Sequence, residues 1–124
     1  MTNLEDINFF VVDVETTGAD NKTDRLTDIA VVQVLNGEII DTFSSLVNPK
    51  RNIPIFIQEM TGITDEMVKS APNEKEVLSE YNSFINKPHS LFVAHNANFD
   101  YYFIRNSMMR IFDKFIESDI LCTV

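Results

Sequence analysis

The chain has 124 residues, of which 44% are hydrophobic, and this is enough to bury the core of one domain but too little for two. Its formal net charge of -9 at pH 7 argues against a nucleic-acid binder that covers phosphates with a basic face, although bound divalent cations would reverse the local field. A single cysteine excludes an internal disulfide and thiolate zinc sites, and no apolar run approaches the roughly 18 residues of a membrane span. We therefore expect one cytoplasmic domain with no secretory leader and no membrane contact.

The first predicted element is an apolar run that ends, within residues 11–18, in two carboxylates and a glycine. Side chains alternate between the two faces of a strand, so Asp13 and Glu15 are predicted on one face while the intervening valines point into the core. Residues 7–12 are hydrophobic enough for a central buried strand, where charges need a partner. Divalent metal is the favoured partner, since the first basic residue is Lys22; a basic residue brought in by folding is the alternative.

The spacing of this acidic pair is not diagnostic by itself. Two other acidic pairs have the same spacing, Glu74 with Glu76 and Glu117 with Asp119, and such a pair ordinarily lies on a solvated face. The apolar setting of the first pair distinguishes it from the other two.

A polar loop leads from the first strand to two further strands joined by a tight turn. Residues 26–34 and 38–47 contain the residue types that suit strands, and Asn36-Gly37 between them favours the positive backbone angles of a type I′ hairpin. Residues 49–54, which begin and end with proline, are predicted as an irregular link.

Two helices are predicted next. Thr64, followed by two acidic residues, is typical of the capped start of a short helix. Asn73 is predicted to cap a longer helix, with Glu76 in the capping-box position and Lys87-Pro88 at its end. Apolar residues recur along this helix at helical spacing and form one face: Val77, Leu78, Tyr81, Phe84 and Ile85.

The last part of the chain returns to strands. Residues 91–94 form a short apolar strand, and Asn96 or Asn98 caps a third helix. Residues 116–121 are predicted as a last strand, although residues 119–124 also have the pattern of a helix start capped by the aspartate at 119.

This order of elements predicts an α/β layered fold. Three strands come first, the second and third of them antiparallel, and helices then alternate with shorter strands. Ligand sites in such sheets lie beyond the strand ends, where both the first acidic pair and the residues after Ala94 are placed.

A third carboxylate follows the strand that ends at Ala94. Asp100 closes the segment 95–100 and lies on the first turn of the third helix. An acid at a helix start ordinarily complements the helix dipole, which is the alternative to a role as a ligand. Its combination with the acids at 13 and 15 favours the ligand role.

Three blocks of the sequence together resemble a known family. They are Asp13–Gly18, Met60–Asp65 and Ala94–Asp100, and they occur in order, at compatible distances and on compatible elements. The chain resembles the DEDD superfamily of 3′-to-5′ exonucleases over nearly its whole length. Within that superfamily it resembles the DnaQ-like branch with a catalytic histidine (DEDDh), which contains the proofreading epsilon subunit of DNA polymerase III and the exonuclease segment of the polymerase C type.

The resemblance implies an RNase H-like mixed sheet, two Mg²⁺ or Mn²⁺ ions, and removal of nucleotides as monophosphates from the 3′ end of DNA in proofreading or repair. By resemblance, Asp13 bridges both ions, Glu15 holds the ion that activates water, and Asp100 serves the second ion. The chemistry fits these residue types, because two ions roughly 3.5 to 4 Å apart activate water and stabilise charge on phosphorus and the leaving oxygen. Hard cations of this kind select carboxylate oxygens.

The resemblance also implies a binding site for the last nucleotides of the strand. Its candidate residues come from the turn after the first strand and from the start of the third helix: Thr16, Thr17, Gly18, His95, Asn96 and Phe99. Turn formation and packing are the alternatives for Thr16 and His95, and core packing is the alternative for Phe99.

The family's last motif is a histidine followed about one helical turn later by an aspartate, which supply the general base and a fourth carboxylate. The chain stops before such a motif, so we expect residues 1–124 to be an exonuclease domain incomplete at its C-terminus, without the C-terminal helices and with little activity as a fragment. His95 and Asp100 have the spacing of that last motif, but the strand before them and Phe99 favour the second motif.

Two alternatives stay open. A complete chain of this kind would be a non-catalytic nucleic-acid-binding or protein-binding module of the same fold, and the substrate would be RNA or short oligonucleotides if it is not DNA. The expected partners are DNA with a single-stranded or frayed 3′ end and DNA polymerase subunits.

Overall fold

The computed structural model describes residues 4–113 and 119–122. A 3₁₀ turn at Leu4–Asp6 precedes the first strand. The strands are β1 (Asn8–Thr16), β2 (Leu26–Leu35), β3 (Glu38–Leu46), β4 (Ser90–Ala94) and β5 (Asp119–Cys122). The helices are α1 (Ile55–Thr61), α2 (Asp65–Val68), α3 (Glu74–Ile85) and α4 (Ala97–Phe112).

The strands form one mixed sheet in the order β3-β2-β1-β4-β5. β1, β2 and β3 pair antiparallel, whereas β4 pairs parallel with both β1 and β5. This arrangement confirms the predicted antiparallel start followed by strands that alternate with helices. It makes β1 the central strand, between the hairpin and the parallel part of the sheet.

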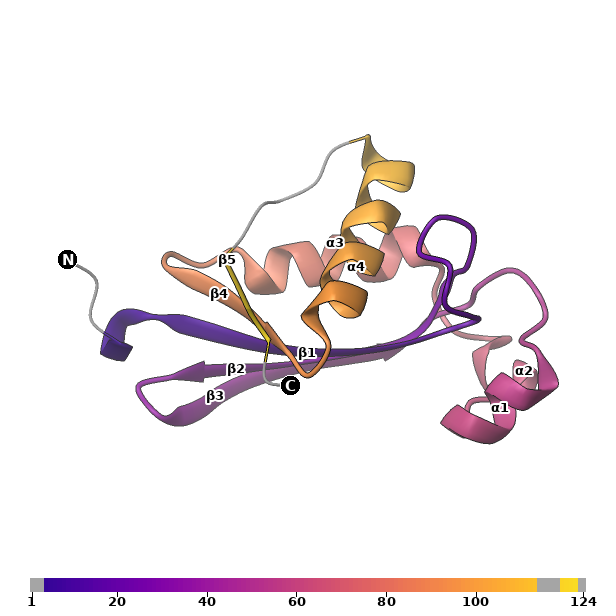
Figure 1. Cartoon of the computed structure of the whole chain (residues 1–124), viewed down its shortest axis with the longest axis horizontal. Helices are drawn as coiled ribbons and strands as arrows, with labels where there is room; N and C mark the ends of the chain where they lie inside the picture. Colours follow the sequence, from indigo (N-terminus) through magenta and orange to yellow (C-terminus); the bar gives the residue numbers. More distant parts are fainter. Residues whose placement is uncertain (1–3, 114–118, 123–124) are drawn as a thin grey trace.

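The core lies between one face of the sheet and the helices α3 and α4, which Figure 1 shows on the same side of the sheet. Alternate residues of β1 are buried on this face, including Phe10, Val12 and Val14, as the period of a strand predicts. The helices contribute buried side chains such as Leu78 and Phe103. A second small cluster, around Ile53, Ile57, Ile63 and Val68, holds α1 and α2 beyond one end of the sheet (Figure 1).

The opposite face of β1 is not buried among the described residues, and the prediction of a strand buried on both faces is wrong. Val11 is 42% exposed and Asp13 is exposed. The cause is that α3 and α4 cover only the other face of the sheet, so the acids at this face are in contact with water. None of the helices in the described ranges is long and apolar enough to cross a bilayer.

Local signals in the sequence place most of the turns and caps correctly. Asn36 and Gly37 have φ of 51° and 77°, which confirms the type I′ hairpin turn. The side chains of Thr64, Asn73 and Asn96 accept hydrogen bonds from main-chain amides in the first turns of α2, α3 and α4.

The helix α1 was not predicted. It starts directly after Pro54, where the predicted irregular link ends, and is followed by Gly62 in the left-handed conformation with φ of 78°. Two predictions about local structure are wrong. Asp119 belongs to the strand β5 and does not cap a helix, while residues 116–118 lie outside the described residues. Glu74 does not lie on a solvated face but is only 8% exposed.

Candidate active site

The candidate active site lies where β1 and β4 part. The two strands pair only from Asn8 to Val11, so the edge of β1 beyond Val11 is left open toward the start of α4. Asp100, in the first turn of α4, is 7% exposed and lies against the main-chain amide of Val14, which favours its ionised form. The parting of the strands therefore brings the third predicted acid to the strand that holds the first two.

Asp13 and Glu15 lie on the same face of β1, as predicted, and the sheet adds a further acid. The antiparallel register sets Asp28 of β2 directly opposite Glu15. Burial raises the pKa of Glu15, and the charges of Asp13 and Asp28 raise it further. Burial also raises the pKa of Asp28, and Asp13 adds to that rise. Like charges directly across a strand pair repel, so this face of the sheet holds an uncompensated negative charge.

Asp100 belongs to the same electrostatic cluster. Burial, followed by the charges of Asp13 and Glu15, raises the pKa of Asp100 to about 6, against the smaller lowering effects of the Val14 amide and His95. The four residues Asp13, Glu15, Asp28 and Asp100 are called the acid cluster below. The structure thus brings the three predicted acids together, within range of one another's charges.

The acid cluster has the donor chemistry of a divalent-metal site. In residues 4–113 and 119–122, no lysine or arginine forms an ion pair with any of its carboxylates; the ion pairs found there join Glu74 to Arg25 and Arg110. Among those residues no three acidic, histidine or cysteine side chains are gathered tightly enough to enclose an ion as they stand. Asp13 is exposed and Glu15 half-exposed, so both have room to turn toward a hard cation, which prefers such oxygens.

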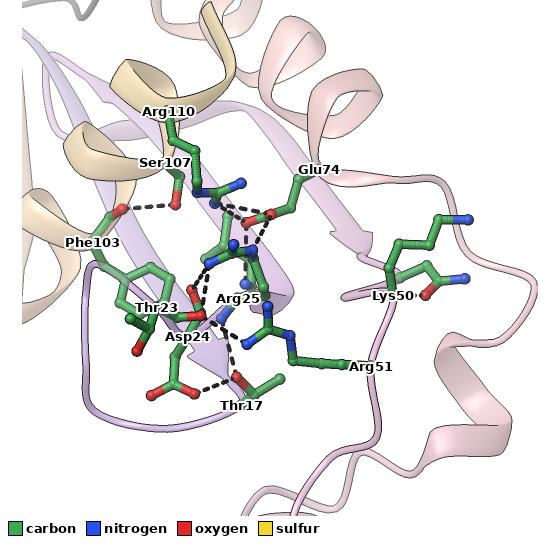
Figure 2. A network of polar contacts seen from close by, with 12 residues as sticks. Thr17, Thr23, Asp24, Arg25, Lys50, Arg51, Glu74, Phe103, Ser107 and Arg110 are labelled. Carbon is green, nitrogen blue, oxygen red and sulfur yellow. Dashed lines mark hydrogen bonds and ion pairs between the residues drawn. The ribbon is translucent and has the colours of Figure 1, made fainter.

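The turn after β1 is held by the side chains of its two threonines. Thr16 donates a hydrogen bond of 2.6 Å to the main-chain oxygen of Gly18. Thr17 is 2% exposed, and it donates to Asp24 at 2.7 Å and accepts from the amide of Arg25 at 3.0 Å (Figure 2). A Cβ at Gly18 would lie 2.5 Å from a carboxylate oxygen of Asp24, so a larger residue there would have to displace the Asp24 side chain from its hydrogen bond with Thr17. The hydroxyl of Thr17 therefore serves the turn itself.

A pocket of about 280 Å³ adjoins the acid cluster. It brings together four predicted site residues, which are Glu15, Thr16, Gly18 and Phe99. Its remaining walls come from β1, the turn after it and the helix α1: Val14, Ala19, Ile57, Met60 and Thr61. The pocket is therefore polar on the side of the acids and apolar on the side of α1.

The other predicted substrate residues lie at the start of α4, outside that pocket. His95 is exposed and close enough to Asp100 to lower its pKa. Asn96 accepts a hydrogen bond from the amide of Phe99 at 3.4 Å and so caps α4. The ring of Phe99 is half-buried and lies 5.6 Å from that of Phe103, so Phe99 both lines the pocket and packs on the core.

The sequence interpretation missed Asp28 and the residues of α1. An aspartate in an alternating strand is ordinarily a solvent-facing residue, and only the register with β1 shows that Asp28 opposes Glu15. The signal for α1 was present, as a proline before the helix and a glycine after it. Met60, in this helix, is 71% exposed beside the pocket.

Known proteins are similar to this chain in sequence. Residues 10–124 match the sequence profile of the exonuclease family of the RNase T type. The chain is 41% identical over 119 residues to the PolC-type DNA polymerase III of Clostridium perfringens and 43% identical over 109 residues to that of Staphylococcus epidermidis. These alignments cover 96% and 88% of this chain but only 8% and 7% of the relatives, so the chain spans less than a tenth of their length.

Solved structures of exonuclease I are similar to this chain in fold. A product-bound exonuclease I superposes with a TM-score of 0.84 over 94% of this chain and 30% of that one, at 19% identity. Exonuclease I of E. coli in complex with a dA16 oligonucleotide gives a TM-score of 0.79 over 91% of this chain and 24% of that one, at 22% identity. These superpositions confirm the predicted RNase H-like fold. With the profile and the PolC-type relatives, they establish that the chain belongs to the DnaQ-like (DEDD) exonuclease family.

Proposed function

We propose that this chain hydrolyses the last phosphodiester bond at the 3′ end of a DNA strand, with two Mg²⁺ or Mn²⁺ ions held by Asp13, Glu15 and Asp100. The observation that supports this most directly is the acid cluster, which has no lysine or arginine partner in the described part of the chain. The four carboxylates repel one another with no lysine or arginine of the described residues to offset them, and divalent cations would relieve that repulsion.

The bound ions would supply a water nucleophile at neutral pH and neutralise charge on the phosphate. Asp13, being exposed at the centre of the cluster, is the residue best placed to reach both ions. Glu15 lies between the cluster and the pocket, and Asp100 is fixed by burial and by the Val14 amide. Asp28 adds negative potential opposite Glu15 without lining the pocket.

The pocket beside the acids suits the terminal nucleotide. Its apolar wall, with Ile57, Met60 and Phe99, offers surfaces against which a base that has left the stack can lie. Thr16 and Gly18 form the polar floor next to Glu15, where the sugar and phosphate would sit. His95 and Asn96 lie at the start of α4, on the side of Asp100, and are proposed to contact the preceding nucleotide.

A DNA substrate with a single-stranded or frayed 3′ end is supported by the relatives. The similar proteins are PolC-type DNA polymerases III, and similar structures include exonuclease I with DNA oligonucleotides. The similarity to PolC-type DNA polymerases III also supports DNA polymerase subunits, in the cytoplasm, as the proposed partners. RNA or short oligonucleotides are the alternative substrates, which the experiment below compares directly.

The test is hydrolysis of matched DNA and RNA single strands, in long and short lengths and labelled at either the 3′ or the 5′ end, with Mn²⁺ in excess. We expect slow release of labelled mononucleotide from the 3′-labelled strand and a shortening ladder from the 5′-labelled strand. Asp13→Asn should lower the rate by at least about 100-fold, because it removes a charge that acts on the developing transition state. Glu76→Gln, an exposed acid on α3, is the matched control and should leave the rate unchanged.

Three results would contradict the proposal. Release of the label from the 5′ end would contradict the proposed 3′-to-5′ polarity. A rate for Asp13→Asn equal to that of the unaltered chain would show that the acid cluster takes no part in the reaction. Absence of both hydrolysis and Mn²⁺ binding would favour a non-catalytic binding module of the same fold. Faster hydrolysis of the RNA strand than of the DNA strand would change the substrate but not the chemistry.

A further inference from the structure

Basic side chains line a groove of about 460 Å³ next to the turn after β1, apart from the pocket beside the acid cluster. We call it the basic groove, and its basic lining residues are Arg25, Lys50, Arg51, Lys75 and Arg110. These are five of the ten lysines and arginines in a chain with a net charge of -9. The positive charge of the protein is therefore concentrated at one place, although the five residues come from distant parts of the sequence.

The arginines of the groove are close enough to repel one another. Arg110 donates to both carboxylate oxygens of Glu74, at 3.0 and 3.2 Å, and Arg25 lies 3.7 Å from the same carboxylate (Figure 2). Arg51 donates to the main-chain oxygen of Thr23 at 2.8 Å, next to Arg25. Burial lowers the pKa of Arg25, and the charges of Arg110 and Arg51 lower it further. Arg25 and Arg110 thus share the carboxylate of Glu74, and Arg51 lies close enough to Arg25 for its charge to act on it.

The groove keeps an excess of positive charge after this pairing. Glu74 is the one acidic residue among the described residues that line it, against five cations. The ammonium groups of Lys50 and Lys75 form no ion pair within residues 4–113 and 119–122. A second hollow of about 440 Å³ shares Lys50 and Arg51 with the groove and is also lined by Lys69 and one acid, Asp65.

The basic groove and the candidate active site lie on the two sides of one turn. The amide of Thr17 donates to the main-chain oxygen of Arg25 at 2.8 Å, and the Arg25 amide donates back to the Thr17 hydroxyl. The neighbours of Thr17, which are Thr16 and Gly18, line the pocket next to the acids. A strand that leaves the pocket over this turn would therefore meet the basic groove.

We propose that the basic groove binds the phosphates of single-stranded nucleic acid upstream of the 3′ end that the acid cluster holds. Guanidinium groups match phosphate oxygens with paired hydrogen bonds, and the flexible lysines at the rim add charge without fixing a sequence. The described lining contains no aromatic side chain and only Pro49 and Ile111 as apolar ones, so it offers little to anchor the side chains of an acidic peptide. The placement of the 3′ end at the acid cluster rests on the proposed function, whereas the affinity of the basic groove for phosphates does not.

The test measures binding of a labelled oligothymidine of about 12 nucleotides by fluorescence anisotropy, in EDTA so that neither hydrolysis nor the metal site contributes. Lys75→Gln and Lys50→Asn remove charges that make no ion pair, and asparagine tolerates the left-handed backbone of Lys50, where φ is 58°. Each variant should lower the slope of log K against log salt by about 0.7, and the pair together should weaken binding about tenfold at about 50 mM salt. Lys87→Gln, at the other end of α3, removes the same charge outside the groove and should stay within about twofold.

The outcomes separate this proposal from the proposed function. If the double variant binds as tightly as Lys87→Gln, the groove does not hold the strand, even where the chain hydrolyses DNA. If the groove variants lose binding in a chain that hydrolyses nothing, the groove stands and the nuclease proposal falls. If polyglutamate of equal charge displaces the oligonucleotide as well as unlabelled oligothymidine does, the groove binds acidic peptides and the nucleic-acid assignment is overturned. Thermal unfolding of each variant checks that its fold is intact.

Discussion

The turn around Thr17 separates two charge clusters that are built in opposite ways. On one side, the carboxylates of the acid cluster have no lysine or arginine partner among the described residues, and the pKa values of Glu15, Asp28 and Asp100 are raised. On the other side, the basic groove contains its own counter-ion, because Glu74 is bound by Arg110 and Arg25. The ion pairs of Glu74 neutralise its buried charge within the fold, whereas no lysine or arginine of the described residues does so for the acid cluster.

Of the substitutions that test this comparison, the loss of Glu74 should have the largest effect on the free energy of unfolding. Its carboxylate joins Arg25 and Arg110 and also accepts the main-chain amide of Leu26 at 3.3 Å. We expect Glu74→Ala to lower the free energy of unfolding by about 3 kcal/mol, because it leaves half-buried arginines and a buried amide without their acceptor. Urea denaturation measures the loss, and Glu76→Ala, on the exposed side of the same turn, should change it by less than about 0.5 kcal/mol. Equal effects of the two substitutions would show that the Glu74 cluster does not stabilise the fold.

The acid cluster should instead destabilise the metal-free protein at neutral pH. The pKa of Asp100 is about 6 in the fold and near 3.8 in an ordinary environment, so the folded chain binds more protons than the unfolded chain between these values. The free energy of unfolding should therefore fall as the pH rises from about 4 to about 7, by about 2 kcal/mol for this residue. Urea denaturation in EDTA across this range measures the slope, and Asp100→Asn should flatten it. A stability that rises with pH, with the same slope in Asp100→Asn, would contradict the raised pKa of Asp100, which burial and the neighbouring acids produce together.

The turn that separates the two clusters has a smaller effect of its own. Thr17→Val keeps the shape of the side chain but removes the hydrogen bonds to Asp24 and from the Arg25 amide. We expect a loss of about 1.5 kcal/mol in the free energy of unfolding, since the Arg25 amide and the buried side of Asp24 lose their partner. Amide hydrogen exchange of residues 18–25 should speed up in this variant. Unchanged exchange there would mean that the hydroxyl does not hold the turn.

The smallest of these effects concerns the cap that positions Glu74. Asn73 accepts the Glu76 amide at 2.9 Å and so fixes the first turn of α3, where Glu74 lies. Asn73→Ala should cost about 1 kcal/mol by thermal or urea unfolding, and Asn73→Asp should retain most of the stability, because both asparagine and aspartate are good caps. A loss as large as that of Glu74→Ala would show that the cap, and not the ion pairs, holds this part of the groove.

The sequence predicts one cluster far better than the other, for a physical reason. Asp13 and Glu15 are two residues apart in one strand, so the alternation of side chains alone puts them on one face. Asp100 follows a strand and a helix cap, and its approach to them was expected from its place beyond a strand end and from the resemblance to the exonuclease family. Asp28 reaches the cluster through the register of β2, which no local pattern specifies.

The basic groove has no counterpart in any local pattern of the sequence. Its cations lie at the start of β2, in the link after β3, and on α3 and α4, and only the packing of these elements brings them together. Glu74 was expected on a solvated face because an acidic pair at this interval ordinarily lies in contact with water. Its burial follows from the position of Arg110, 36 residues further along the chain. Strands, caps and the hairpin turn depend on neighbouring residues, and for that reason they were predictable.

The most direct test of the acid cluster is calorimetric titration of Mn²⁺ into the chain at about pH 7.5, above the raised pKa of Asp100. We predict saturable binding that Asp13→Asn and Asp100→Asn each weaken by at least about tenfold, while Glu76→Gln leaves it unchanged. The same ion should raise the unfolding temperature of the unaltered chain and not that of Asp13→Asn. No heat of binding at millimolar Mn²⁺, or equal binding by the unaltered chain and Asp13→Asn, would contradict the claim that these acids form a metal site.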